Sequence, residues 1–158
     1  MVRRVTYENA TEKDYDEIMD LNGRSVVVAT AAAIPHLKAA AKDDSGFIIN
    51  TTSIAARNGA SGGAGLYGSS KAFVHNVTRG MAKELIPFGI RVNAIAAGFF
   101  PHETSTAGRR EGGTEVLQNM IPAGRTGSIH EFGWLSAMTC TPFLAGLTGQ
   151  VILQDGGQ

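Results

Sequence analysis

The sequence predicts an α/β fold in which about three short buried strands alternate with helices. Apolar runs rich in β-branched residues occur at 47–52 and 90–95, and a third lies within 147–157. Apolar residues at helical spacing fill 65–86, between the first two runs. Buried strands that alternate with helices are typical of α/β domains.

The composition is that of an ordinary globular chain. At 158 residues, with 43% apolar and 18% charged side chains, we expect 1–158 to form a single domain. The net charge of zero argues against nucleic acid or an anionic membrane as a partner. Cys140 is the only cysteine, so no internal disulfide can form and a cytoplasmic location is expected. No apolar run approaches the roughly 20 residues of a membrane span.

The first predicted helix begins near residue 11, with Thr11 or Asn9 as its N-cap. Asn22 and Gly23 interrupt it, and glycine lowers helix stability by roughly 1 kcal/mol relative to alanine. The helix resumes over 26–40. Because no charge lies between residues 24 and 38, we expect this second part to be buried on most sides.

Three polar residues follow the first strand in a pattern that suggests proton transfer. Ser53 falls where the strand should end, and a glycine-rich loop leads to Tyr67 and Lys71 on the next helix. Residues four apart share a helix face, so the tyrosine and the lysine can point into one site. A lysine cation is expected to lower the phenol pKa from its usual value near ~10, and Ser53 could orient a substrate oxygen.

Residues 63–68 spell the pattern G-x-G-x-x-G, which also occurs in dinucleotide-binding turns. That motif requires a strand directly before the glycines and an acid at the end of the next strand. Neither is present, so we interpret these glycines as a flexible approach to the helix.

The second half predicts one more buried strand, a lid and a final helix and strand. Pro87 and Gly89 end the helix of 65–86, and a strand covers 90–98. We expect a mobile loop over 99–113, a short lid helix over 115–120 and a helix over 131–143.

At these residues the chain resembles the short-chain dehydrogenase/reductase family. The family's Tyr-x-x-x-Lys stands as Tyr67–Lys71, its upstream serine is similar to Ser53, and its helix asparagine is similar to Asn22. The resemblance continues through 90–98 and the closing Asp-Gly-Gly at 155–157. It implies a partial Rossmann-like, doubly wound parallel sheet of about three strands.

The resemblance also implies roles for individual residues. Ser53, Tyr67 and Lys71 would be catalytic, with Asn22 supporting a water-linked proton relay. The same tyrosine and lysine would contact the cofactor, together with residues of the region after the second strand: Ala97, Gly98 and Thr104. His102 stands where the family's cofactor-contacting threonine is expected, and Ala97 replaces its proline. No metal site is predicted, because the four histidines lack ligand spacing.

The implied function is hydride transfer between NAD or NADP and an alcohol or carbonyl substrate. The family's glycine-rich cofactor half, roughly its first four strands, has no counterpart in 1–158, so the strand at 47–52 is expected to be an open edge. We therefore expect a homo-oligomer or a partner that supplies the missing half. The alternatives are a non-catalytic oligomerisation or interaction module and, more remotely, a hydrolase that uses Ser53, although no G-x-S-x-G is present.

Overall fold

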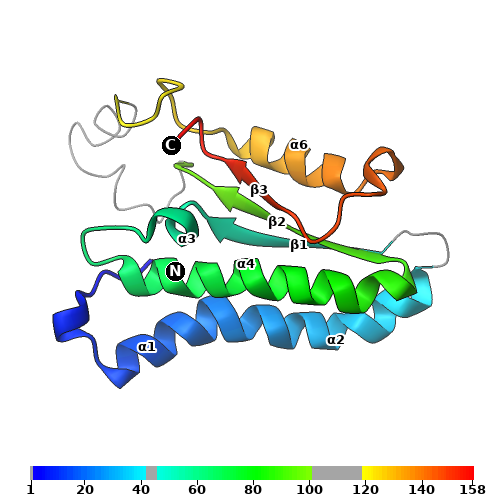
Figure 1. The fold of residues 1–158 in the computed structure, drawn as a ribbon, viewed down its shortest axis with the longest axis horizontal. Helices are drawn as coiled ribbons and strands as arrows, with labels where there is room; N and C mark the ends of the chain where they lie inside the picture. The colour runs from blue at the N-terminus through cyan, green and yellow to red at the C-terminus, as the bar shows by residue number, and fades with distance from the viewer. Residues whose placement is uncertain (1, 42–45, 101–118) are drawn as a thin grey trace.

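The computed structural model, which describes residues 2–41, 46–100 and 119–158, has a three-stranded parallel sheet at its centre (Figure 1). The strands are β1 (Gly46–Ser53), β2 (Ile90–Ala97) and β3 (Val151–Gln154), in the order β1-β2-β3. Ser53 pairs with Ala97, and Ala97 with Gln154, so the carboxyl ends of all three strands lie together. The predicted α/β fold with about three parallel strands is confirmed.

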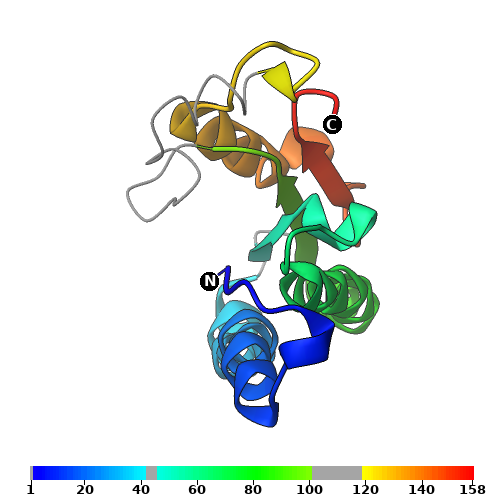
Figure 2. The same ribbon diagram turned by 90° about the vertical axis from the view of Figure 1, so that its left-hand side faces the viewer.

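The helices cover both faces of the sheet (Figure 2). Helices α2 (Ser25–Ala40) and α4 (Gly65–Leu85) lie on one side, and α6 (Ile129–Thr139) lies on the other. Because a parallel pair of strands needs a long crossover, α4 between β1 and β2 and α6 between β2 and β3 supply the connections. Within the described residues β1 pairs only with β2, so its other edge is open, as the sequence predicted.

The amino-terminal part begins with η1 (Tyr7–Asn9) and α1 (Glu12–Met19). Thr11 is the N-cap of α1: its side chain accepts a hydrogen bond from the Asp14 amide, and the Asp14 side chain accepts one from the Thr11 amide. The helix then passes through one π-helical turn, η2 (Asp20–Arg24), before α2 begins. The interruption predicted at Asn22 is therefore present, as an extra residue in a continuous helix.

The expectation that 26–40 is buried on most sides is wrong. Thr30 is the only buried residue of α2, and Val28 keeps 60% of its surface exposed. The main contacts of α2 are with β1 and η2, and much of the rest of its surface is exposed. An uncharged run shows that a helix can be buried. How much of its surface is buried depends on which other elements pack against it.

Helix α4 provides the main core contact with the sheet. A short helix α3 (Ala55–Asn58) precedes it where a loop was expected, and η3 (Ile86–Phe88) follows at the predicted proline and glycine. Ala82 and Leu85 of α4 pack with Ile90 and Val92 of β2 in the apolar core. The predicted helix over 65–86 is confirmed within one residue.

Helix α6 both begins and ends earlier than the sequence predicted. Ser128 and Glu131 form a capping box that starts the helix at Ile129 rather than at 131. The helix ends at Thr139 rather than at 143, and η4 (Pro142–Leu144) follows. None of the described helices is long and apolar enough to cross a membrane.

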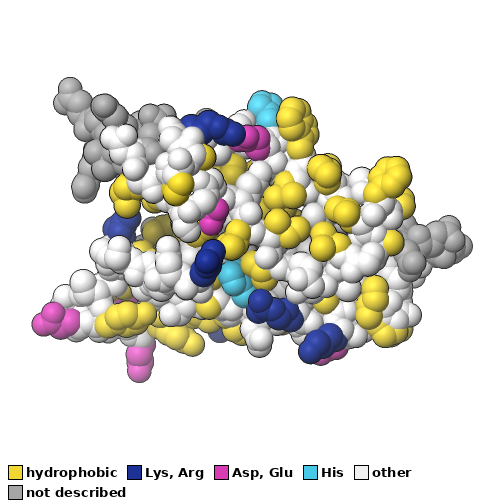
Figure 3. Space-filling model, turned by 45° about the horizontal axis from the view of Figure 1, so that its top comes forward, with side chains coloured by type: hydrophobic (Ala, Val, Ile, Leu, Met, Phe, Trp, Pro, Cys, Tyr) yellow, Lys and Arg dark blue, Asp and Glu magenta, His cyan; other side chains and the backbone are white. Residues whose placement is uncertain are grey.

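Buried Arg91 of β2 connects the end of α6 to the sheet. Its guanidinium donates hydrogen bonds to the carbonyl oxygens of Thr139, Thr141 and Leu144, at 3.1, 2.9 and 2.6 Å. The outer surface here is apolar: Figure 3 shows hydrophobic side chains gathered over α6 and β3. The most exposed apolar side chains of α6 and η4 are Phe143, Trp134, Ile129 and Met138.

Candidate active site

The structure brings Ser53, Tyr67 and Lys71 to the carboxyl end of β1. Ser53 is the last residue of β1, and α4 starts at the same end of the strand (Figure 1). Tyr67 lies in the first turn of α4 and Lys71 one turn later. The carboxyl edge of a parallel sheet is where α/β proteins bind their ligands, so these residues lie where a site is expected.

The phenol of Tyr67 interacts with the side chain of Ser53. Burial raises the pKa of the Tyr67 phenol above its usual value, and the interaction with Ser53 lowers it by a smaller amount. The Ser53 hydroxyl oxygen also accepts a hydrogen bond from the Ala55 amide at 3.2 Å, which ties the end of β1 to the turn that follows it. At neutral pH Tyr67 is therefore protonated and can donate its proton.

Lys71 does not lower the pKa of Tyr67 here, which corrects the expectation from the sequence. Its ammonium nitrogen lies 5.9 Å from the centroid of the Tyr67 ring and donates a hydrogen bond to the Thr51 carbonyl oxygen at 3.1 Å. Burial lowers the pKa of Lys71 itself. The predicted effect of the lysine fails because the amine is held by the backbone of β1 and not against the phenol.

Asn22 lies near Lys71, although the two come from different helices. Asn22 is in the π-helical turn η2 and is 4% exposed. Both side chains line a cavity of about 480 Å³ between α2 and the open edge of β1. The rest of its lining is mainly small or apolar, including Ala29, Ile48 and Ile49.

The predicted cofactor-contacting residues after β2 are described only in part. Ala97 ends β2, and its carbonyl oxygen accepts a hydrogen bond from the Ile54 amide at 3.1 Å. Gly98 lies against the carboxyl-terminal turn, where an added Cβ would come within 2.7 Å of the Asp155 Cα atom. Thr104, His102, the loop over 99–113 beyond residue 100 and most of the predicted lid helix lie outside the described residues.

The glycine-rich loop before α4 packs against the amino-terminal segment of the chain. The Val5 amide donates to the Gly63 carbonyl oxygen at 2.8 Å, and the Arg4 guanidinium donates to the Gly62 carbonyl oxygen at 2.9 Å. A Cβ on Gly65 would lie 2.7 Å from the Tyr7 hydroxyl. The lack of side chains on these glycines allows the loop and the amino-terminal segment to approach each other closely. This contact explains the glycines by packing, without phosphate binding.

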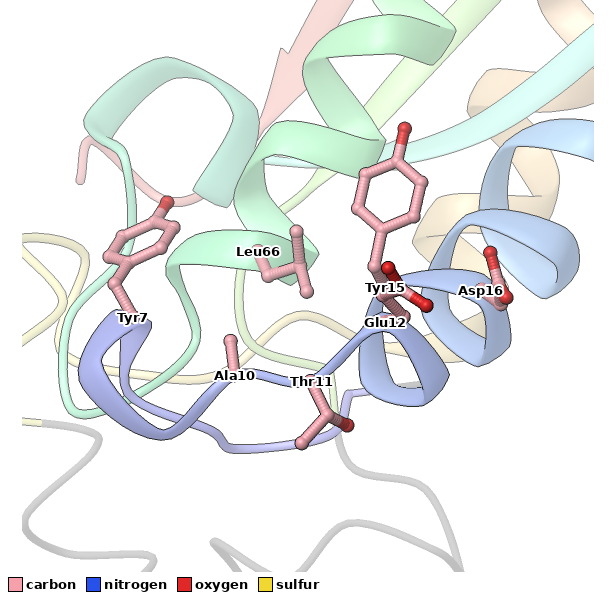
Figure 4. Close-up of a pocket in the computed structure, with 7 residues that line it drawn as sticks. All are labelled: Tyr7, Ala10, Thr11, Glu12, Tyr15, Asp16 and Leu66. Carbon is pink, nitrogen blue, oxygen red and sulfur yellow. The ribbon is translucent and has the colours of Figure 1, made fainter.

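A second hollow, of about 460 Å³, lies beside α1 (Figure 4). Tyr7, Tyr15 and Leu66 are among the residues that line it, together with the acidic residues Glu12 and Asp16. None of the residues predicted for the active site lines it. In the described part of the chain, no group of three His, Cys, Asp or Glu side chains could hold a metal ion.

Sequence reasoning missed two residues beside the site. The Thr51 carbonyl oxygen holds the Lys71 ammonium, and the buried Thr52 hydroxyl donates to the Lys71 carbonyl oxygen at 3.1 Å. The available signal was a pair of polar β-branched residues at the end of a buried strand, directly before Ser53.

The fold and the site define the class: a doubly wound α/β protein with polar residues grouped at the carboxyl edge of its sheet. Comparison with known proteins identifies the family. The family described as Enoyl-(Acyl carrier protein) reductase matches residues 2–158. The chain belongs to the short-chain dehydrogenase/reductase family, as the sequence motifs predicted.

Among curated proteins, the 3-oxoacyl-[acyl-carrier-protein] reductase of Thermotoga maritima is 34% identical over 146 residues, which are 92% of this chain and 57% of that protein. The gluconate 5-dehydrogenase of Gluconobacter oxydans is 30% identical and is matched over 98% of this chain and 59% of its own length. The chain thus spans somewhat more than half the length of these relatives.

Solved structures show the same relationship. The Pseudomonas aeruginosa RhlG/NADP active-site complex superimposes with a TM-score of 0.91 at 31% identity, covering 99% of this chain and 62% of the other. A gluconate 5-dehydrogenase from Burkholderia cenocepacia, in complex with NADP and tartrate, gives a TM-score of 0.89 at 25% identity, covering 99% and 60%.

Proposed function

We propose that this chain forms the catalytic part of an oxidoreductase that reduces a carbonyl substrate, or oxidises the corresponding alcohol, with NAD or NADP. The observation that carries the proposal is the grouping of Ser53, Tyr67 and Lys71 at the carboxyl edge of the sheet, with Lys71 one helical turn from Tyr67. The names of its relatives, which include reductases and a dehydrogenase, support the same reaction type.

In the reductive direction, Tyr67 would donate its proton to the substrate oxygen, and a bound NADH or NADPH would supply the hydride for the carbonyl carbon. Ser53 donates a hydrogen bond to the same oxygen and stabilises the charge that develops on it. The raised pKa of Tyr67 suits this direction, because the phenol keeps its proton until the oxygen becomes basic. In the oxidative direction a phenolate would have to form first, which burial disfavours.

The residues present fit the nicotinamide-ribose end of the cofactor. An ammonium carries three donors, and the Thr51 carbonyl oxygen accepts one from Lys71, so others are available for ribose hydroxyls. Lys71 and Asn22 face the same cavity, and we propose that they support proton movement to Tyr67 through water. The pyrophosphate has no comparable cradle among the described residues, because the glycine-rich loop is covered by Arg4 and Val5.

The test uses this chain joined behind the amino-terminal part of the Thermotoga maritima reductase, because this chain spans 57% of that relative and we infer that the glycine-rich cofactor half is the part it lacks. Tyr67→Phe should reduce turnover by roughly 10²–10⁴-fold, the usual contribution of general acid–base catalysis, while leaving cofactor affinity within about threefold. Tyr15→Phe, on an exposed tyrosine, is the matched control and should leave turnover unchanged. Turnover of Tyr67→Phe within about threefold of the parent would contradict the proposal.

We also propose that the chain self-associates through the apolar surface of α6 and η4. Trp134, Met138 and Phe143 are 71, 58 and 95% exposed, and residues this apolar are enriched at protein interfaces. The double variant Trp134→Ser with Met138→Ser should lower the molar mass measured by light scattering. Leu21→Ser, on an exposed leucine of η2, should not. An unchanged mass in the double variant would show that this surface is not the interface.

A further inference from the structure

Three consecutive residues of β1 contact the first turns of α4. The Ser53 side chain interacts with Tyr67, the Thr51 carbonyl oxygen accepts a hydrogen bond from the Lys71 ammonium, and the Thr52 hydroxyl donates one to the Lys71 carbonyl oxygen. Two of these contacts hold Lys71, one at its side chain and one at its backbone. The end of the strand therefore fixes the position of the helical turn that carries Tyr67.

Thr52 is the buried member of this set. It is 2% exposed, and its side chain faces α4, as does that of Asn50 two residues earlier. A carbonyl inside a helix already accepts a hydrogen bond from an amide four residues on, so the helix does not need Thr52 to satisfy Lys71. The additional bond is instead a contact between strand and helix that resists sliding of α4 along β1.

A second contact of the same kind lies two turns further along α4, away from the site. The Asn50 side-chain amide donates to the Thr78 hydroxyl at 2.9 Å, and this hydroxyl donates to the Val74 carbonyl oxygen at 2.8 Å. Thr78 is fully buried. It thus offers a matched threonine whose loss weakens the contact between α4 and β1 without touching the turn of Tyr67.

We propose that Thr52 is a positioning residue, which holds the Tyr67–Lys71 turn of α4 against β1 so that Tyr67 meets Ser53. Thr52 touches neither the phenol nor a reacting atom, and it acts through the backbone of Lys71. The inference rests on the proposed function only in giving the Tyr67–Ser53 contact a chemical purpose. Its test needs neither substrate nor cofactor, so its failure would leave the oxidoreductase proposal standing.

The experiment titrates Tyr67 in the 158-residue chain by NMR, with ¹³C at the ζ carbon of tyrosine. Tyr67→Phe assigns the signal against those of Tyr7 and Tyr15. Ser53→Ala gives the reference: without the serine hydroxyl the phenolate loses a hydrogen bond, so the pKa of Tyr67 should rise. Thr52→Val, which keeps the shape and removes the hydroxyl, should move the pKa in the same direction, and Thr52→Ser should restore it.

The double variant Thr52→Val with Ser53→Ala should titrate like Ser53→Ala alone, because both changes remove the same contact. Thr78→Val should lower the unfolding midpoint at least as much as Thr52→Val but leave the Tyr67 titration unchanged. Thr52→Ala is measured beside Thr52→Val, so that a poorly folded valine variant does not decide the result. The proposal is overturned if the folded Thr52 variants titrate like the parent, or if Thr78→Val shifts Tyr67 equally.

Discussion

Helices α4 and α6 cover opposite faces of one sheet but are held to it in different ways. Val74, Thr78, Ala82 and Leu85 of α4 are all buried, so this helix is fixed along its length. Thr139 is the only buried residue of α6, which is held at its start by a capping box and at its end by Arg91. The residues proposed for chemistry lie on the helix that is fixed throughout.

This difference indicates how much displacement of its helix each side of the sheet can tolerate. Small displacements of Tyr67 would separate it from Ser53, so α4 needs an apolar core and buried polar contacts along its length. Helix α6 carries no residue proposed for proton transfer, and its outer surface is available for another copy of the chain. The predictions below test whether the two helices differ in this way.

The largest effect is expected from the core side of α4. Leu85→Ala should destabilise the chain by about 3 kcal/mol, because it removes a buried side chain that packs with Ile90 and Val92. Met138→Ala, on the exposed side of α6, should change stability by less than about 0.5 kcal/mol when measured at dilutions where the chain is monomeric. Chemical denaturation measures both. Equal losses would show that α6 is packed along its length as α4 is.

An intermediate effect is expected at the anchored end of α6. Arg91→Met should cost about 2 kcal/mol, since it leaves the carbonyl oxygens of Thr139, Thr141 and Leu144 without their buried donor. Hydrogen exchange should increase over 139–147 and remain at the parent's rate in α4. Arg79→Met, on an exposed arginine of α4, is the control. Faster exchange across both helices would mean that Arg91 supports the whole core.

The smallest effect is expected at the start of α6 and depends on pH. Two hydrogen bonds from Arg125 and one from the Ser128 amide lower the pKa of Glu131 from 4.5 to about 2. Since the folded pKa lies below the unfolded one, the stability that Glu131 contributes is present above pH 4.5 and is lost as the pH falls toward 2.

Glu131→Gln should therefore flatten the dependence of stability on pH within that window, as followed by denaturation at a series of acidic pH values. Arg125→Met should flatten it partly, because it removes the largest cause of the lowered pKa. The effect should shrink at high salt, since the pair is exposed. An unaltered slope in both variants would place the acid sensitivity elsewhere.

Features with strong local signals could be predicted from the sequence. The β-branched runs located β1 and β2, and Pro87 and Gly89 marked the end of α4. The N-cap of α1 was predicted as Thr11 or Asn9, and it is Thr11. Spacing alone was enough to group Ser53, Tyr67 and Lys71, because a strand end and one helical turn fix their approximate positions. The roles of these residues and of Asn22 remain predictions.

Features that depend on neighbouring elements could not be predicted in this way. The exposure of α2 depends on which elements cover it, and its uncharged sequence gives no information about them. The cap at Ser128 has a recognisable pattern with Glu131 that was overlooked. The position of the Lys71 amine depends on where one backbone carbonyl points, so the direction of the Tyr67 pKa shift could not be derived from a Tyr-x-x-x-Lys pattern.

The π-helical turn Asp20–Arg24 has a consequence for how the chain tolerates insertions and deletions. A π-helical turn accommodates one residue more than an α-helical turn, and each residue of an α-helix turns the chain by about 100°. Deleting one residue within 20–24 would therefore yield an unbroken α-helix in which everything before the deletion is rotated by about that angle relative to α2. Asn22 could then no longer face the cavity beside Lys71 while α1 kept its contact with α4. The extra residue sets the rotation between α1 and α2. This rotation lets α1 contact α4 while Asn22 faces the cavity beside Lys71.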